Sequence, residues 1–201
     1  MKSKKAARSP RPYTQKSRAE AAEASTTRIL EAFLKRAENQ WFEDITLEAL
    51  AKDAEVTVQT VMRKFGGKAG ILKVAHEHMG KDINVRRSVK PGDVDHSVDV
   101  LTKDYETVGR LVLRLLSQEE RQPTLKPVLE EGRRGHREWL AEVFAEKLAT
   151  LTPARRTAML DALVIAADIY IWKLVRIDMG RPVAAFKAVV KRMLHAALSE
   201  A

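Results

Sequence analysis

Apolar side chains recur every three to four residues along most of the chain, which is the spacing of amphipathic α-helices. The first stripe lies in a helix that is predicted to begin at Ser17 or Ser25 and to end near Asn39. Its members are Ile29, Leu30, Phe33, Leu34 and Ala37. The alternating pattern of β-strands and the Asn-Gly or Asp-Gly turns of hairpins do not occur. The pattern therefore predicts an all-α fold.

Two short helices are predicted after the first one. Thr46 is placed to cap a helix that ends at 53–54, and Thr57 is placed to cap a second helix that runs to about Lys64. Residues 54–56 join the two helices. These lengths match a helix-turn-helix, a unit that places its second helix in the major groove of DNA.

Longer helices are predicted beyond Gly66-Gly67, with Pro91-Gly92 as the clearest internal boundary. Their approximate ranges are 68–90, 97–116, 124–150, 153–179 and 182–198. The segment 153–179 is apolar on nearly all sides, so we expect it to be covered both by its own chain and by a second copy in a two-fold dimer. We assign the dimer interface to Leu163, Ile169, Trp172, Phe186, Val190 and Met193.

Composition narrows the class of protein. The 201 residues are 45% hydrophobic, which supplies a core for one or two domains. The absence of cysteine excludes disulfides, thiol catalysis and cysteine-ligated metals, and it favours a cytoplasmic location. The longest apolar run, 162–167, is far too short to span a membrane, so no membrane partner is expected.

Charge is distributed unevenly along the chain. The net charge of +9 comes from 36 Lys and Arg residues against 27 Asp and Glu, and seven of the basic residues lie in 1–18, which has no acid. We expect 1–18 to be a basic disordered arm, either a DNA-contacting arm or a solvated leader. Residues 57–73 hold four basic residues and no acid. Within the globular part of the chain, the local excess of positive charge therefore lies on the second short helix and on the helix that follows it.

Candidate DNA contacts are found at the helix caps and on the second short helix. Hydroxyls and cations can bind phosphates, and Gln59 can read an adenine through two hydrogen bonds. Lys68 and the N–H groups at the start of its helix can hold another phosphate. We assign DNA binding to Thr46, Thr57, Val58, Gln59, Thr60, Arg63, Lys64 and Lys68.

Six spaced motifs occur in order between Arg28 and Leu72. They are Ile29-Leu30-Glu31-Ala32-Phe33, Thr46-Leu47-Glu48-Ala49-Leu50-Ala51, Ala54-Glu55-Val56-Thr57, Thr60-Val61, Phe65-Gly66-Gly67-Lys68 and Ile71-Leu72. Together they resemble the DNA-binding head of the TetR family of one-component bacterial regulators. The sequence departs from the family at Glu55 and Trp41, where glycine is usual, and at Met62, where an aromatic residue is usual.

The resemblance implies an all-α homodimer with a DNA-binding domain, 19–73, and a helical effector-binding and dimerisation domain, 74–201. It also implies a repressor that leaves a palindromic double-stranded DNA operator when a small-molecule effector binds. The effector is of unknown identity. Candidate ligand-binding residues in the larger domain are Tyr105, Arg110, Val112, Trp139, Asp168 and Tyr170, with His136 as a further polar anchor. The presence of Asp168 inside an apolar stretch is explained equally well by a hydrogen bond to a neighbouring helix.

Enzymatic chemistry has little support in the sequence. His76 and His78 are two residues apart and lack the i, i+4 spacing of a helical zinc site. The stretch 93–96 has too few ligands for a calcium loop, and no Gly-rich phosphate loop or G-x-S-x-G motif occurs. We therefore expect neither an enzyme nor a cofactor or metal site. The alternative to a DNA-binding regulator is a helical adaptor that binds protein.

Overall fold

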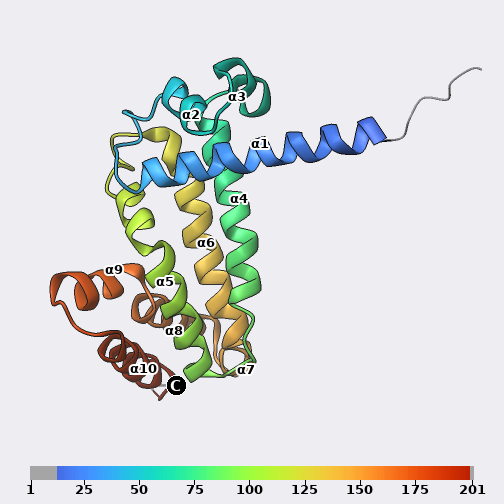
Figure 1. Cartoon of the computed structure of the whole chain (residues 1–201). Helices are drawn as coiled ribbons and strands as arrows, with labels where there is room; N and C mark the ends of the chain where they lie inside the picture. The colour runs from blue at the N-terminus through green and yellow to red at the C-terminus, as the bar shows by residue number, and fades with distance from the viewer. Residues whose placement is uncertain (1–12, 200–201) are drawn as a thin grey trace, which may run out of the picture.

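Helices and turns make up the part of the chain that the structure describes. The computed structural model describes the backbone of residues 13–199 and the side chains of residues 20–80 and 87–199. Within those limits it contains no strand, which confirms the predicted all-α fold. A head is built from α1 (Tyr13–Ala37), α2 (Leu47–Asp53), α3 (Val58–Phe65) and the first turns of α4 (Lys68–Arg86). In Figure 1, α1 crosses α4 and α6 near their upper ends, with α2 and α3 above it.

The remaining helices form a body below the head (Figure 1). Its helices are α5 (Val94–Leu116), α6 (Lys126–Val143), α7 (Ala145–Ala149), α8 (Pro153–Ala166), α9 (Ile169–Trp172) and α10 (Val183–Ser199). A 3-10 turn, η1 (Pro123–Leu125), precedes α6, and a π-helical segment, η2 (Lys173–Asp178), continues α9. The helix α4 runs from head to body without a break, so residue 73, the predicted domain boundary, lies inside a helix. Among the described helices, none combines the length and apolar character needed to cross a bilayer.

The predicted caps of the helix-turn-helix are confirmed. The hydroxyl of Thr46 accepts a hydrogen bond from the backbone N–H of Ala49 at 3.1 Å, and that of Thr57 accepts one from Thr60 at 3.2 Å. Gly66 ends α3 in the left-handed conformation with a φ of 71°. Each cap satisfies backbone groups that a helix end leaves unpaired. Local sequence therefore sets where α2 and α3 begin and where α3 ends.

The turn between α2 and α3 carries backbone strain at Glu55. Among residues 13–199 it is the one residue other than glycine with a positive φ, 54°. We predict that Glu55→Gly raises the free energy of unfolding by about 1 kcal/mol, because glycine adopts this conformation without a Cβ clash. The matched control Glu48→Gly, inside α2, is expected to lower it by about 1 kcal/mol. Urea unfolding measures both changes, and destabilisation by both substitutions would show that residue 55 is not strained.

Two helix starts differ from the prediction. The helix α1 begins at Tyr13, before Ser17 and Ser25, so residues 13–18 of the expected disordered arm are helical. Residues 1–12 of that arm lie outside the described residues. The helix α5 begins at Val94 because the carboxylate of Asp93 accepts a hydrogen bond from a backbone N–H of its first turn at 2.9 Å.

Two predicted long helices are broken. The helix expected over 124–150 is interrupted at Phe144, which is buried in the body core with non-helical φ and ψ of −106° and 22°. The helix expected over 153–179 stops at Ala166, and Asp168 starts a new one by accepting a hydrogen bond from the N–H of Tyr170 at 2.8 Å. The first break coincides with a ring buried in the body core, and an N-cap marks the second.

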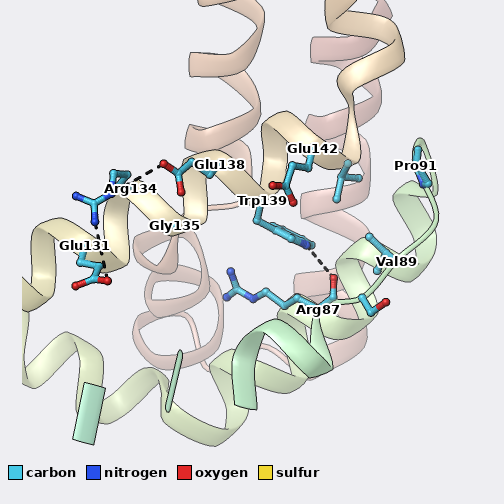
Figure 2. A pocket seen from close by; sticks show the side chains of 11 residues that line it. Arg87, Val89, Pro91, Glu131, Arg134, Gly135, Glu138, Trp139 and Glu142 are labelled. Carbon is cyan, nitrogen blue, oxygen red and sulfur yellow. Dashed lines mark hydrogen bonds and ion pairs between the residues drawn. The ribbon is translucent and has the colours of Figure 1, made fainter. Parts of the chain in front are cut away.

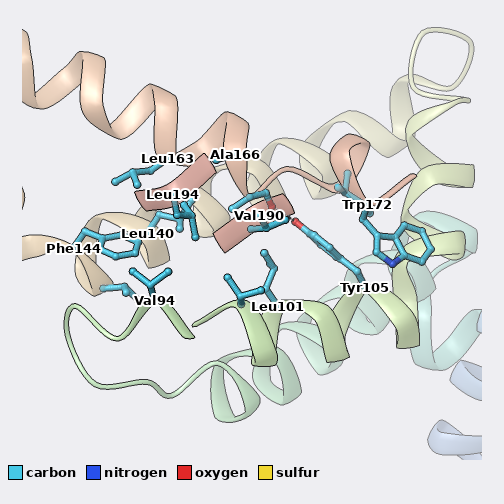
Figure 3. Close-up of a cluster of buried hydrophobic side chains, with 14 of the residues drawn as sticks. Val94, Leu101, Tyr105, Leu140, Phe144, Leu163, Ala166, Trp172, Val190 and Leu194 are labelled. Carbon is cyan, nitrogen blue, oxygen red and sulfur yellow. Dashed lines mark hydrogen bonds between the residues drawn. The ribbon is translucent and has the colours of Figure 1, made fainter. Parts of the chain in front are cut away.

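The body core lies where α5, α6, α8 and α10 meet (Figure 3). Its buried side chains include Leu101, Leu140, Phe144, Leu163, Val190 and Leu194. Gly109 allows α5 to approach α9 closely, since a Cβ there would lie 2.8 Å from the ring of Trp172. The indole N–H of Trp172 then donates to Glu106 at 2.7 Å. The inner faces of α8, α9 and α10 therefore pack against other helices of the same chain.

Most of the residues assigned to the dimer interface pack within their own chain. Five of its six residues are buried within their own chain, and Met193 is half-buried. The five are Leu163, Ile169, Trp172, Phe186 and Val190. A periodic apolar stripe does not reveal whether it faces the same chain or a second copy, and here the stripe faces the chain's own core.

Candidate nucleic-acid interface and enclosed cavity

The recognition-helix candidate, α3, has one buried and one exposed face. Val61 is buried, and Val58 and Phe65 pack half-buried against the head core. Gln59 and Arg63 are exposed and lie one turn apart, so they share the outer face. An amide and a guanidinium so placed can form hydrogen bonds with base edges and phosphates. The structure thus keeps two of the predicted DNA-binding side chains together and accessible, while Val58 serves mainly the head core.

Three threonines lie beside that face. Thr57 and Thr46 are exposed at the starts of α3 and α2, and Thr60 is half-buried. The hydroxyls of Thr57 and Thr60 are 3.0 Å apart. A capping hydroxyl accepts from the helix and still has a proton to donate. Met62, exposed next to Arg63, places a thioether where the resemblance leads one to expect an aromatic ring.

Lys64 is turned toward α1 instead of outward. Its ammonium donates to the carbonyl oxygen of Ala22 at 2.6 Å and to the hydroxyl of Thr26 at 2.9 Å. Nearby, Arg28 of α1 donates to the carbonyl oxygen of Ala54 at the end of α2, at 2.9 Å. These bonds fasten α1 to the helix-turn-helix. Lys64 therefore serves the positioning of α3 in the described structure.

Lys68 holds the loop between α1 and α2. Its ammonium donates to the carbonyl oxygens of Phe42 at 2.8 Å and Glu43 at 3.0 Å, and it lies 4.9 Å from the centroid of the Phe42 ring. The sequence offered no signal for this role, because the partners are 25 and 26 residues away. Two of the three cations among the predicted DNA contacts, Lys64 and Lys68, are thus bonded within their own chain.

The same loop is bound to the end of α5. The buried Gln118 accepts the backbone N–H of Phe42 at 2.6 Å. Arg114 donates to the carbonyl oxygens of Gln40 at 3.0 Å and Asn39 at 3.1 Å, and its guanidinium lies 5.3 Å from the ring centroid of Trp41. We call this set of contacts the head–body clamp. It connects the orientation of the head to the position of α5.

A cavity of about 310 Å³ lies between α4, α5 and α6 and reaches α1 of the head. Most of its lining is apolar, from residues such as Phe33, Leu34, Leu72, Leu111, Leu115 and Leu129. Of the predicted ligand-binding residues, those that line it are Tyr105, Val112, Trp139, Asp168 and the additional anchor His136.

Arg110 and Tyr170 are corrected, because both are exposed and neither lines the cavity. Tyr105 and Val112 are two helical turns apart and share a face of α5, whereas Arg110 falls on another side. Asp168 starts α9 and turns Tyr170 to the surface. The sequence pattern gave the right helix for Arg110 and the wrong face.

Polar groups gather at one end of the cavity. Arg87 donates to the carboxylate of the buried Asp104 at 2.6 Å, and one of its terminal nitrogens lies 3.3 Å from Nδ1 of His136. The indole N–H of Trp139 donates to the carbonyl oxygen of Arg87 at 3.0 Å. Tyr105 donates to the carbonyl oxygen of Ala167 at 2.8 Å, and burial raises the pKa of its phenol. Arg87 and Asp104 were not among the predicted site residues.

His136 is held neutral at this end, since burial and the Arg87 cation lower its pKa to about 3. In the unfolded chain, the imidazole of His136 has a pKa near 6.5. Below that pH the unfolded chain therefore binds a proton at His136 that the folded chain does not. The free energy of unfolding should therefore decrease by about 1.4 kcal/mol for each pH unit below about 6.5. Between about pH 6.5 and 5, wild type is expected to lose about 2 kcal/mol more than His136→Phe in urea unfolding. Identical pH dependence in the two proteins would contradict the neutral, buried imidazole.

A second, more open hollow of about 570 Å³ lies on the outer side of Trp139 (Figure 2). It shares Arg87 and Trp139 with the cavity, and its rim carries Glu138, Glu142 and Arg134. Figure 2 shows the hydrogen bond from the indole N–H of Trp139 to the carbonyl oxygen of Arg87. The lining of this hollow is mostly polar, so the cavity with the mostly apolar lining is the better candidate for holding a small molecule.

Comparison with known proteins identifies the fold. No protein-family model matches the sequence, and no curated protein matches it. A crystal structure of a transcriptional regulator from Rhodococcus sp. Rha1 matches this chain with a TM-score of 0.65 and 15% sequence identity. The match covers 90% of this chain and 97% of the other. The chain therefore shares the fold of that protein over both head and body.

Proposed function

We propose that the protein is a DNA-binding transcription regulator of the TetR type that inserts α3 into the major groove. The observation that carries the proposal is the outer face of α3, where Gln59 and Arg63 are exposed on a helix whose caps are both in place. The 57–73 stretch has no acid that would repel phosphates. The fold likeness to a transcriptional regulator supports the same function.

The proposed DNA contacts fall into two groups. Gln59 and Arg63 read bases or bind phosphates directly, and the hydroxyls of Thr46 and Thr57 donate to phosphates. Lys64, like Lys68, acts instead on the position of α3, through the bonds to α1 and to the loop before α2. This division differs from the sequence-based expectation, in which all were direct contacts.

We further propose that two copies pair through the outer surface of residues 165–179. Among the body residues whose side chains are described, the large exposed apolar ones lie there: Ile165 is 61% exposed, Tyr170 55%, Leu174 44% and Met179 57%. A cluster of this kind is typical of a surface that a partner covers. A two-fold pair would present two α3 helices, which suits a palindromic operator.

Ile165→Glu is accordingly expected to weaken the dimer at least about tenfold, because it places a charge in an apolar contact. Analytical ultracentrifugation over a concentration series measures the effect. Met62→Glu is the matched control, an exposed apolar residue on α3 that should leave self-association unchanged. An Ile165→Glu protein that associates as tightly as wild type would place the dimer surface elsewhere.

Regulation would arise from a small molecule in the cavity between α4, α5 and α6. The cavity wall includes Phe33 and Leu72 of the head as well as α5 and α6 of the body. A molecule that fits better when these elements separate would shift the head from its DNA-binding orientation, since a ligand acts only through its different affinity for the two states. The head–body clamp supplies the connection between α5 and the head. We propose that the unliganded dimer represses and that the effector releases it.

Selection from a pool of random duplexes by the full chain tests the proposal. Enrichment of a two-fold symmetric sequence, with half-sites about one DNA turn apart, is the expected result. A parallel selection with Gln59→Ala should lose information at one base position in each half-site. If no sequence is enriched, the regulator is excluded and a helical adaptor becomes the better interpretation.

A further inference from the structure

We infer that the head–body clamp holds the head at one angle on the body and so sets the spacing of the two operator half-sites that a dimer binds. The inference rests on the proposed function, because it concerns an operator read by two copies of α3. It adds two positioning residues, Gln118 and Trp41, which lie in the clamp and not on the proposed DNA-binding face.

The head is joined to the body on two sides. The helix α4 runs from one to the other, and the loop 38–46 is bonded to the end of α5. In Figure 1 that loop lies at the left of the head, above the upper end of α5, and α4 descends on the other side. A head carried by one helix alone could turn as that helix bends, and the second attachment removes this freedom.

Apolar packing between head and body does not fix the angle by itself. Leu111, Leu125 and Leu129 of the body lie in the same buried cluster as the apolar residues of the head. Burial of apolar surface is non-directional, so it stabilises a range of relative angles. Hydrogen bonds weaken steeply when their angles change. The hydrogen bonds of the clamp therefore select one orientation.

Phe42 is the point of the loop that is held from three directions. Its backbone N–H donates to Oε1 of Gln118 at 2.6 Å, and its carbonyl oxygen accepts from Lys68 of α4 at 2.8 Å. Its ring meets that of Phe33 on α1 edge-on, with centroids 6.3 Å apart and an interplanar angle of 84°. One residue thus joins α1, α4 and the end of α5.

Gln118 is the buried part of the clamp, and 2% of its surface is exposed. While its Oε1 accepts from Phe42, its Nε2 donates to the carbonyl oxygen of Arg114, one turn earlier, at 2.8 Å. Both ends of the amide are bonded, so α5 itself orients the acceptor for the loop. Loss of that acceptor leaves the N–H of Phe42 without this partner, which is costly in a buried place.

Trp41 is the exposed part of the clamp, with 42% of its surface accessible. The guanidinium carbons of Arg114 and Arg121 lie 5.3 and 6.0 Å from the centroid of its ring, within the range of a cation–π contact. Arg114 also donates to the carbonyl oxygens of Asn39 and Gln40. The ring therefore helps to hold the guanidinium that fastens the loop. A glycine, which is usual here in the family that the head resembles, would offer no ring.

The angle of the head decides where α3 meets DNA. Successive base pairs are about 3.4 Å apart along the duplex, so a shift of α3 by that distance changes the spacing of the half-sites by one base pair. Two copies with fixed heads accept one spacing, and two copies with freely turning heads accept several. The clamp thus contributes to the choice of operator without a contact to DNA.

The first experiment measures the distance between head and body without DNA or ligand. The chain has no cysteine, so Met62→Cys on α3 and Lys103→Cys on α5 give two unique labelling sites, both exposed. The labelled full chain is mixed with an excess of unlabelled chain, and double electron–electron resonance gives the distribution of distances within one copy. We expect a single narrow distribution with the clamp intact, and one that is about 3 Å broader, the scale of one base-pair step, with Gln118→Met.

Two further variants make the comparison decisive. Trp41→Ala removes an exposed ring, so it keeps the fold and should broaden the distribution even where Gln118→Met does not fold. Thr102→Val is the matched control, because it removes another buried hydrogen bond of α5, from the hydroxyl of Thr102 to the carbonyl oxygen of Val98 at 2.6 Å, away from the clamp. It should leave the distribution unchanged.

The second experiment measures the spacing preference on the operator that the wild-type chain selects. Duplexes with one base pair added to or removed from the centre are compared with it by fluorescence anisotropy. Wild type should prefer the original spacing by about tenfold, a loss typical of one mismatched base pair. In Gln118→Met and Trp41→Ala this preference should fall by about threefold, the effect of one lost hydrogen bond. A base change within a half-site should cost these variants as much as wild type.

The possible outcomes separate the inference from the proposed function. A wild-type distribution as broad as that of the variants, or variants as narrow as wild type, would overturn the inference. An unchanged spacing preference in both variants would overturn it as well. An operator bound equally well at all three spacings by wild type would uphold DNA binding and remove the role of the clamp. If no operator is selected, the proposed function fails, and the spacing rule fails with it.

Discussion

Replacing Asp104 with asparagine is expected to lower the free energy of unfolding by about 3 kcal/mol, one of the two largest effects we predict. The side chains of Asp104 and Arg87 are 1% and 10% exposed, and their atoms are 2.6 Å apart. Asparagine keeps the shape and removes the charge, so the Arg87 cation stays in the interior without a counter-charge. Urea unfolding, with the midpoint and slope fitted separately, measures the loss.

The ion pair of Arg36 and Asp53 is the matched control. Its atoms are also 2.6 Å apart, but the two side chains are 23% and 37% exposed. Water screens that pair, so Asp53→Asn should cost less than about 1 kcal/mol. Equal losses from Asp104→Asn and Asp53→Asn would show that the pair at the cavity is solvated.

Replacing both Gln59 and Arg63 with alanine is expected to weaken binding to the selected operator by about 100-fold, because each side chain contributes about 1 to 3 kcal/mol of contact. Both are exposed, so the fold should be unaffected. Fluorescence anisotropy at fixed salt measures the affinity. Repeating the titration across a salt series should show a smaller slope of log K against log salt, since one phosphate-binding cation is removed.

Lys103→Ala provides the control for that experiment. It removes the same charge from an exposed position on α5 in the body. Affinity and salt slope should both match those of wild type. A double variant that binds as tightly as wild type, or a Lys103→Ala protein that loses as much, would mean that DNA binding depends on net charge and not on the face of α3.

Local signals predicted the head well. Thr46 and Thr57 cap helices because a short hydroxyl side chain reaches the N–H groups of the first turn, an interaction within three residues. Gly66 ends α3 because it adopts a positive φ freely. The strain at Glu55 could also be expected, because the resemblance places glycine at this position of the turn and the residue has a φ of 54°. Interactions within one turn of the chain can be read directly from sequence.

Features that depend on distant residues could not be predicted in the same way. The break at Phe144 has no breaker residue and follows from burial of that ring. Asp168 could have been read as a cap, because a carboxylate inside an apolar run is a typical start signal. Burial of the predicted dimer residues depends on how α8, α10 and α5 pack, which periodicity does not specify.

The polar end of the cavity shows the same limit most clearly. Arg87 lies 17 residues from Asp104 and 49 from His136, and no spacing rule connects them. Lys64 and Lys68 were predicted to contact phosphates because a count of charges does not show where each side chain points. Their partners are provided by α1 and by the loop before α2. Composition drew attention to the proposed interface, and only packing distinguished the exposed Arg63 from Lys64 and Lys68, which bind their own chain.

Titration with DNA tests most directly whether α3 reads a sequence. The full chain is titrated into labelled duplex from upstream of its own gene and into a shuffled duplex of equal length and composition, at physiological salt. Saturable binding with at least about 1,000-fold preference for the upstream duplex is the expected result. Weak binding of equal strength to both duplexes, lost as salt is added, would contradict it.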